Sequence, residues 1–502
     1  MSAKQQGLLL GTILMLFSNI IVKGLGFAYR VILVRLLGTE GVGLIEMVSP
    51  LFSFLLVFAG LGIQPALSQK VASTGDDKQI FMRTAQIMLL FSGILLTLAG
   101  FGATDFMIAH FVPDQRIYHC FRLILPAIAV ISVAAAYRGW FQGMRQVSVI
   151  GGSQTIEQLV RVIIGVYLAE KLLNLGLEQA VSAASLATVC GETAGFLYLF
   201  CRFHGGKKAV FKKPKPRFSW AAAAQLLRYG MPITAGKMIS SGIMMLQAFL
   251  IPLSLQVAGW DMRAATEIYG RFSGVALSML HLPGVFTTAL AVSVLPAVAE
   301  SMNFAHNGRQ LLAQRIGQSL TATAIFTLPG MAILFLLAEP LCTWIFANPP
   351  AAPILKLLAL GGSFFYLQLT LVSILQGLGA VKPLLINNII SGLILLAGIA
   401  LLTSSPRLGI LGTAIAVDIA WISGMLLNLR QVIIISRVTL PWKQILIKPL
   451  LALIGALLLF FFAKTWLLSL FTNDKIAILL LSSCFFASYL LLLVLQGGLK
   501  LK

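Results

Sequence analysis

Charged residues are scarce in this sequence of 502 amino acids, and their scarcity excludes most classes of soluble protein. Asp, Glu, Lys and Arg make up 11% of the chain, whereas soluble domains average about 25%. A soluble fold of this length could not cover its surface with so few charges, which excludes a cytosolic enzyme, a disordered protein and a fibre. The hydrophobic fraction of 58% and the mean hydropathy of +0.93 indicate a polytopic membrane protein.

Motifs for catalysis and for cofactor binding are also lacking. The sequence has no GxxxxGK[ST] loop, which excludes direct ATP hydrolysis, and it has no HExxH motif, nucleophile elbow or haem signature. The five cysteines are scattered and include no CxxC pair, so they support neither a disulfide framework nor a zinc site. The sequence therefore predicts no catalytic residue, no metal and no cofactor.

Long apolar windows are abundant, and they predict an all-α protein. A spanning helix needs about 20 mostly apolar residues. The first window has no convincing signal-peptide cleavage site after it, so we interpret it as a retained span. By this criterion about fourteen spans are expected, at 8–33, 42–66, 84–111, 119–144, 150–172, 179–202, 231–256, 268–296, 317–338, 354–378, 383–403, 409–435, 447–468 and 475–496.

The basic residues are distributed unevenly between the two sides of these spans. The formal net charge is +21, and in a membrane protein such an excess faces anionic lipid heads rather than nucleic acid. With the N-terminus inside, 23 of the 37 Lys and Arg residues, Arg138 among them, fall in inner loops and tails, and 7 fall outside. This bias predicts that both termini are cytoplasmic.

The longest polar insert and a weak internal repeat divide the chain. Phe141–Met144 resembles Leu375–Leu378, 234 residues later, and Pro65-Ala66, which we expect to end the second span, resembles Pro296-Ala297 at an offset of 231. An even-numbered unit used twice gives parallel repeats with a cavity between them; chance similarity of apolar helices is the alternative. The predicted organisation is a six-helix lobe at 1–204, a basic cytoplasmic linker at 205–220, a second six-helix lobe at 221–438 and two additional spans at 439–502.

Ionisable residues inside the spans are the most informative feature. A charge at mid-bilayer costs roughly 2.5–3.5 kcal/mol on insertion scales, so such residues face a cavity or a partner. The basic set has seven members, and Lys356, Arg122 and Arg271 lie near span ends, where they can snorkel. The positive balance suits an anionic substrate such as a diphosphate, which Arg grips with a planar fork. The candidate substrate-binding residues are Lys23, Arg30, Arg122, Arg161, Lys237 and Arg271.

The acidic residues inside the spans allow two interpretations each. Glu157 and Arg161 are four residues apart on one helix face, either as a self-neutralising pair or as part of a cavity. Glu192 and Asp418 are candidates for carrying protons or Na⁺, or for contacts with neighbouring helices. Glu157, Glu192 and Asp418 are thus the candidate ion-coupling residues, with H⁺, Na⁺ or the membrane potential as the drive.

Several segments resemble the polysaccharide-export branch of the MOP exporter superfamily, and in particular its stage V sporulation protein B-type members. They are Lys23–Arg30 (KGLGFAYR), Arg35–Gly38 (RLLG), Glu40–Leu44 (EGVGL), Arg138–Gly143 (RGWFQG) and Glu157–Arg161 (EQLVR). The resemblance covers most of the chain. It implies two six-helix lobes in a V plus two C-terminal helices that help to shape a groove for a lipid tail.

The same resemblance implies flipping of lipid-linked sugars, such as lipid II or polysaccharide precursors. MurJ-type lipid II flippases carry a cavity arginine where this chain has Lys23, and basic residues in the second span where it has Phe54 and Leu55. The predicted function is a flippase for an undecaprenyl-diphosphate-linked sugar in the bacterial cytoplasmic membrane, working by alternating access for cell-envelope synthesis. Its expected partners are that substrate, membrane lipids and envelope-synthesis enzymes. The alternatives are a cation-coupled multidrug antiporter, a membrane-embedded glycosyltransferase or ligase, and a non-transporting scaffold.

Overall fold

Helices make up the structure, a computed structural model that describes residues 3–73, 77–205, 218–284, 287, 294, 298–300, 308–470 and 474–497. Within these ranges no strand is present, and eleven helical segments are long and apolar enough to cross a membrane. The chain is therefore an all-α, multi-pass membrane protein. The predicted linker falls largely on residues 206–217, outside the described ranges, and the predicted span 268–296 lies partly outside them.

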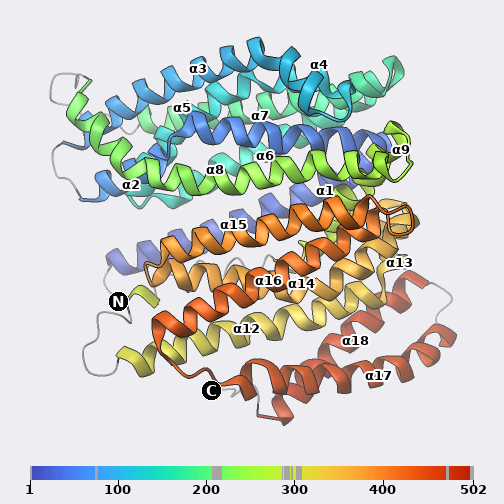
Figure 1. Cartoon of the computed structure of the whole chain (residues 1–502). Coiled ribbons are helices and arrows are strands. Elements are labelled where there is room, and N and C mark those ends of the chain that lie inside the picture. Colours follow the sequence, from blue (N-terminus) through green and yellow to red (C-terminus); the bar gives the residue numbers. More distant parts are fainter. Residues whose placement is uncertain are drawn as a thin grey trace. The chain divides into compact units, whose positions relative to one another are not determined.

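The first helix, α1, runs over Ala3–Gly60 and consists of two limbs (Figure 1). Gly38 adopts φ 69° and ψ 177° between them, a conformation that favours glycine. Arg30 and Glu46 would lie about 24 Å apart along a straight helix at 1.5 Å per residue, yet their side chains form a salt bridge of 2.6 Å. The chain therefore reverses at Gly38, and the limbs correspond to the predicted spans 8–33 and 42–66.

The end of the second predicted span needs a correction. The second limb ends at Gly60, and a turn at Leu61 and Gly62 leads into a separate short helix, α2 (Ile63–Ser73). Gly62 has φ 62°, and an added Cβ there would meet the backbone of Gly230. Pro65-Ala66 thus lies inside the first turns of α2 rather than at the end of a span, because the tight turn comes before it.

The other helices of the first compact unit, residues 1–274, follow the predicted spans with two exceptions. One begins at Trp220, before the predicted start at 231, and the helix Met262–Gly270 lies mostly outside any predicted span. The span predicted at 119–144 is divided at Leu125, where Pro126 occupies the first turn of a new helix. These elements are α3 (Lys78–Phe111), η1 (Gln115–Ile117), α4 (Tyr118–Ile124), α5 (Pro126–Gly143), α6 (Val147–Leu172), η2 (Leu173–Leu175), α7 (Leu177–Gly205), α8 (Trp220–Val257) and α9 (Met262–Gly270).

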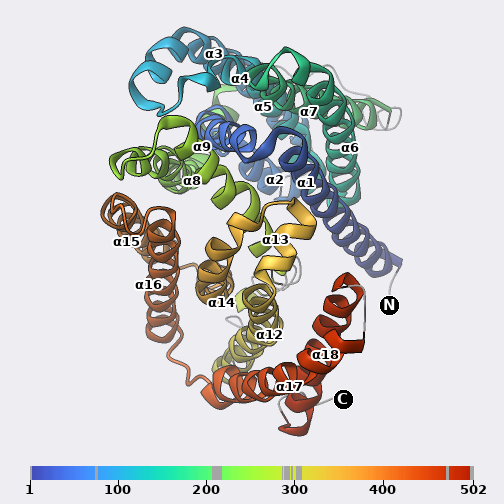
Figure 2. The ribbon, with the colours of Figure 1, turned by 90° about the vertical axis from the view of Figure 1, so that its right-hand side faces the viewer.

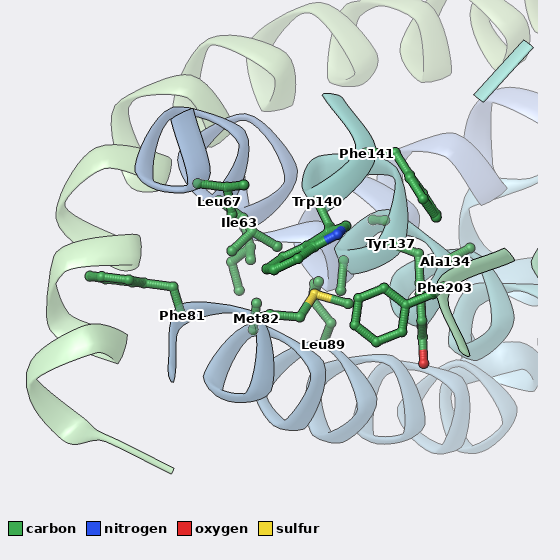
Figure 3. Packing of buried hydrophobic residues seen from close by; sticks show 14 of the residues in the cluster. Ile63, Leu67, Phe81, Met82, Leu89, Ala134, Tyr137, Trp140, Phe141 and Phe203 are labelled. Carbon is green, nitrogen blue, oxygen red and sulfur yellow. The ribbon is translucent and has the colours of Figure 1, made fainter. Parts of the chain in front are cut away.

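One apolar core of this unit joins α2, α3, α5 and α7 (Figure 3). Tyr137 and Trp140 of α5 each meet the ring of Phe203 edge to face, with centroids 5.3 and 5.5 Å apart. Small residues bring α2 and α5 together, because an added Cβ on Gly139 would lie 2.7 Å from the carbonyl oxygen of Gln64. Close packing through small residues is the usual way in which membrane helices associate.

The second compact unit comprises residues 275–502. Hydrogen bonds cross between its helices: Asn387 Nδ2 donates to Asn428 Oδ1 at 2.9 Å, and the hydroxyls of Thr323 and Thr370 lie 2.7 Å apart. Its elements, which begin with a π-helix shared with the first unit, are η4 (Arg271–Ala276), α10 (Leu277–Leu280), α12 (Gly308–Leu336), α13 (Ala338–Phe346), η5 (Pro349–Ala351), α14 (Ala352–Gly377), α15 (Val381–Gly398), η6 (Ile399–Thr403), α16 (Ile410–Ser436), η7 (Lys443–Ile447), α17 (Lys448–Leu470) and α18 (Asp474–Leu495).

The last two helices form a pair within this unit. Figures 1 and 2 show α17 and α18 side by side in red. Phe460 and Phe485 meet edge to face at 5.7 Å, and Tyr489 is fully buried. Their shared core includes Ile325 of α12 and the following Leu337, so the two additional helices pack against α12 of the same unit.

The two segments that the predicted repeat matches end in the same kind of turn. The amides of Met144, Arg145 and Gln146 donate to the carbonyls of Trp140, Gln142 and Phe141, at 2.8 to 3.0 Å. The amides 234 positions later, at 378, 379 and 380, donate to the carbonyls at 374, 376 and 375 in the same pattern. The left-handed residue of this turn is Arg145 in the first copy and Gly379 in the second, with φ 59° and 71°. The amides of Ala258, Gly259 and Trp260 donate to the carbonyls of Ser254, Gln256 and Leu255 in this pattern too. The turn is therefore a common way to end a helix, and the internal repeat stays a prediction.

The compact units differ from the predicted lobes at one point. The sequence prediction assigns α8 and α9 to the second lobe, whereas both helices pack against α1 and belong to the unit that ends at Gly274. The count of fourteen spans stays a prediction. Among the eleven apolar segments, the two limbs of α1 are counted as a single segment. The helix α6, which carries Glu157 and Arg161, is not counted among them.

Candidate functional site

Four charged side chains from three helices form a closed ring inside the first unit, the charge quartet of Arg138, Glu157, Arg161 and Glu192. Arg161 Nη2 lies 2.7 Å from Glu157 Oε1 and 3.1 Å from Glu192 Oε1. Arg138 Nη2 lies 3.1 Å from Glu157 Oε2 and 3.2 Å from Glu192 Oε2. Each carboxylate thus accepts hydrogen bonds from both guanidinium groups, and the four charges cancel.

Glycines on α7 allow this ring to close. An added Cβ on Gly191 would lie 2.7 Å from the carbonyl oxygen of Glu157, and one on Gly195 would lie 3.2 Å from the Glu157 Cβ. Ser153 of α6 also donates its hydroxyl to the carbonyl of Gly195 at 3.0 Å. The close approach of α6 and α7 places Glu192 beside the pair that Glu157 and Arg161 form on one face of α6.

The quartet corrects one assignment made from the sequence. The basic-residue tally places Arg138 in an inner loop, whereas it lies within α5, and its side chain is 14% exposed. The sequence could have placed Arg138 within a helix, because this residue falls inside the predicted span 119–144. Glu157 and Arg161 do pair, but with two further partners, so the guanidinium of Arg161 is already engaged by two carboxylates.

A second charged group joins the turn of α1, η1 and α9. The carboxylate of Asp114 is fully buried; it accepts hydrogen bonds from the Arg116 side chain, with Nη2 at 2.7 Å, and from the Thr266 hydroxyl at 2.8 Å. Arg116 also pairs with Glu40. Residues far apart in the sequence are therefore held together here, which explains why α9 belongs to the first unit.

Two predicted substrate-binding arginines have acidic partners close to this turn. Arg271 pairs with Glu267 of α9 at 2.5 Å, and Glu267 also accepts a hydrogen bond from the Thr39 hydroxyl at 3.4 Å. Arg30 pairs with Glu46 across the two limbs of α1. Both arginines are partly exposed, at 27% and 33% of the side chain.

The predicted lysines differ from these arginines in being exposed. Lys23 lies on the first limb of α1 beside Gly24, where an added Cβ would meet nothing within 4 Å. Other positions of that limb are covered, since Gly26 approaches Gln158 of α6 and Tyr29 approaches Gly165. Lys237 is exposed on α8. Both lysines belong to the first unit.

The last two candidates lie elsewhere. Arg122 of α4 is exposed and stacks on Phe101 and Tyr118. Asp418 of α16 belongs to the second unit and is half-buried against Gly361 of α14, where an added Cβ would meet its carboxylate. The structure thus brings Arg161, Glu157 and Glu192 into direct contact, whereas Arg30, Arg122 and Arg271 have separate partners. The binding and coupling roles of all nine residues stay predictions.

Long apolar helices that carry charged side chains define a polytopic membrane protein. A family model described as "Polysaccharide biosynthesis protein" matches residues 8–302. Because this match covers more than half of the chain, the protein belongs to that family, and the resemblance noted from the sequence is confirmed.

A curated relative and two solved structures agree with this assignment. Stage V sporulation protein B of Bacillus subtilis (strain 168) is 29% identical over 449 residues, which cover 88% of this chain and 86% of the relative. The inward closed structure of the lipid II flippase MurJ has a TM-score of 0.72 at 18% identity, covering 96% of this chain and 98% of that one. An inward-facing multidrug resistance MATE family transporter has a TM-score of 0.70 at 14% identity, covering 85% and 99%. The fold is therefore that of the MOP superfamily of membrane transporters.

Proposed function

We propose that the protein is a flippase that moves an undecaprenyl-diphosphate-linked sugar, such as lipid II or a polysaccharide precursor, across the bacterial cytoplasmic membrane by alternating access. Both termini lie in the cytoplasm, as the excess of inner Lys and Arg residues predicts. The translocated product serves cell-envelope synthesis. A protein path is needed because a large polar head cannot enter hydrocarbon without losing its hydrogen bonds to water.

The observation that carries the proposal is the exposure of Lys23 and Lys237 on helices that are otherwise apolar enough to span a membrane. An ammonium group deep in a span costs about 2.5–3.5 kcal/mol, so its retention indicates a function. A diphosphate offers such groups strong, charge-assisted hydrogen bonds. The similarity to MurJ, whose name states lipid II as its substrate, supports this class of ligand.

The charge quartet suggests how an ion drives the cycle. Protonation of Glu157 or Glu192 leaves two guanidinium groups facing one carboxylate, so the ring gains one positive charge. One arginine then has an unmatched fork of donors, which suits a phosphate oxygen. In this proposal protonation of the ring and binding of the diphosphate favour each other, and the membrane potential adds to the drive. Asp418 of the second unit is a further proton or Na⁺ carrier.

The test is translocation of lipid II in vesicles that contain the purified full-length protein. Lipid II heads that become accessible outside the vesicle report flipping, and we expect Lys23→Ala and Lys237→Ala each to slow their appearance by at least about tenfold. Lys171→Ala is the matched control, because Lys171 is exposed at the end of α6. Lys23→Arg and Lys237→Arg keep the charge and are expected to retain most of the rate.

Three outcomes contradict the proposal. Normal rates in both alanine variants would remove the proposed grip on the diphosphate, and an equal loss in Lys171→Ala would make the effect one of general surface charge. Formation of a new product from lipid-linked sugar in detergent, where no leaflet exists to cross, would instead indicate a glycosyltransferase or ligase.

A multidrug antiporter is the second candidate, and the fold it shares with a MATE transporter and the carboxylate of Asp418 favour it. It predicts cation-dependent drug resistance in cells that express the protein. Asp418→Asn should then abolish that resistance, whereas Lys23→Ala should not.

A further inference from the structure

A groove lined by one arginine and one histidine lies among α3, α4, the start of α5 and α7 in the first unit. Its volume is about 430 Å³, and its walls are almost entirely apolar. The lining residues are Phe101, Tyr118, His119, Arg122, Leu123, Pro126, Leu186 and Val189. α3 ends at Phe111 and α4 begins at Tyr118, so Arg122 lies about one turn into its span, close to one membrane boundary.

The guanidinium of Arg122 is oriented but not neutralised. Its carbon lies 5.6 Å from the ring centre of Phe101 and 5.5 Å from that of Tyr118, and its Nη1 donates to the Tyr118 hydroxyl at 2.7 Å. Among the residues that the structure describes, no carboxylate forms a salt bridge with Arg122. The side chain is nevertheless exposed. Stacking on rings fixes the plane of the fork while the side chain stays exposed.

We propose that this groove binds an anionic phospholipid, with one phosphate oxygen pair on Arg122 and one acyl chain against the apolar wall. A glycerophospholipid combines the two features that the groove requires, an anionic phosphate at the membrane boundary and a hydrocarbon chain below it. The single guanidinium matches the one charge of a phosphodiester, whereas a diphosphate carries more charge than one arginine neutralises. The site is thus assigned to a resident membrane lipid, and it does not depend on the proposed transport.

Native mass spectrometry of the full-length protein in detergent, titrated with lipids of defined head group, tests the site. We expect phosphatidylglycerol to bind at least about fivefold more tightly than phosphatidylcholine, and Arg122→Gln to abolish this preference. Leu186→Trp, which fills the groove, should weaken both lipids. Lys171→Gln, which removes an exposed charge at the end of α6, should change neither.

The remaining outcomes each overturn the proposal. A preference that survives Arg122→Gln, or one that Lys171→Gln removes equally, would show that the groove does not select the lipid. Equal binding of glycerol phosphate without acyl chains would show that the apolar wall is not used. Tighter binding of undecaprenyl diphosphate than of phosphatidylglycerol would assign the groove to the substrate. If Arg122→Gln does not fold, the unmodified protein is photo-crosslinked with a phosphatidylglycerol that carries the label on its acyl chain. Crosslinks at Phe101 or Leu186 support the site, and crosslinks at neither residue contradict it.

Discussion

Replacing Glu192 by Gln tests whether the charge quartet acts as one unit. The substitution keeps the size of the side chain but removes one of two negative charges, so Arg138 and Arg161 are left to share Glu157. Hydrogen bonds to charged groups contribute about 1.5–3 kcal/mol each, and breaking a buried ion pair costs about 3–5 kcal/mol. Because the four side chains are 10–22% exposed, we expect a loss at the lower end, about 3 kcal/mol of unfolding free energy.

The assay is reversible unfolding in mixed micelles of increasing dodecyl sulfate content, followed by circular dichroism. Arg161→Gln alone should also destabilise the protein. The double variant Arg161→Gln/Glu192→Gln keeps the neutral pair of Arg138 and Glu157, so its loss should fall short of the sum by at least about 1 kcal/mol. Glu170→Gln, an exposed site on the same helix α6, should change stability by no more than about 0.5 kcal/mol.

Two results would refute this reasoning. A loss for Glu192→Gln as small as that of Glu170→Gln would mean that the ring contributes nothing to stability. Additive losses in the double variant would mean that Arg161 and Glu192 do not interact energetically, although Arg161 Nη2 lies 3.1 Å from Glu192 Oε1 in the structure.

Two further predictions concern helix packing and interhelical hydrogen bonds, and both are measured as shifts in thermal unfolding in detergent. Gly139→Ala should destabilise the protein by about 1–3 kcal/mol, because the added Cβ would press on the rigid carbonyl of Gln64. Gly24→Ala is the control: its Cβ meets nothing within 4 Å, so it should be neutral or stabilise the protein by up to about 1 kcal/mol. Equal effects of the two substitutions would contradict the packing argument. Asn387→Ala should cost about 1 kcal/mol, since it leaves the buried amide of Asn428 without its partner, and an unchanged melting temperature would show that this bond adds nothing.

The existence of most long helices was readable from the sequence, whereas several of their limits were not. Phe141–Met144 and Leu375–Leu378, 234 residues apart, lead into turns with the same backbone hydrogen bonds, which the helix end before Trp260 shares. Such a turn is local, because its bonds join residues within five positions of one another. The reversal at Gly38 is equally local, and the separation of windows 8–33 and 42–66 already placed it.

The candidate site was predicted only in part. The pair of Glu157 and Arg161 follows from helical spacing, since residues four apart share a face. Arg138 is counted with the inner loops although it falls inside the predicted span 119–144, and its two carboxylate partners required the folded chain. The stacking of Arg122 between Phe101 and Tyr118, and the partners Glu46 of Arg30 and Glu267 of Arg271, also required the folded chain.

The sequence by itself determined that this is an all-α membrane protein of the polysaccharide biosynthesis family, because low charge, apolar windows and local motifs act over a few helical turns. Only the tertiary structure decided which charges neutralise one another and which remain exposed. Arg138 and Glu192 are 54 positions apart, and their contact depends on how closely the glycines of α7 let it approach α6. The same dependence on packing placed α8 and α9 with the helices that precede them, since bonds such as Thr266 to Asp114 connect residues that sequence spacing cannot relate.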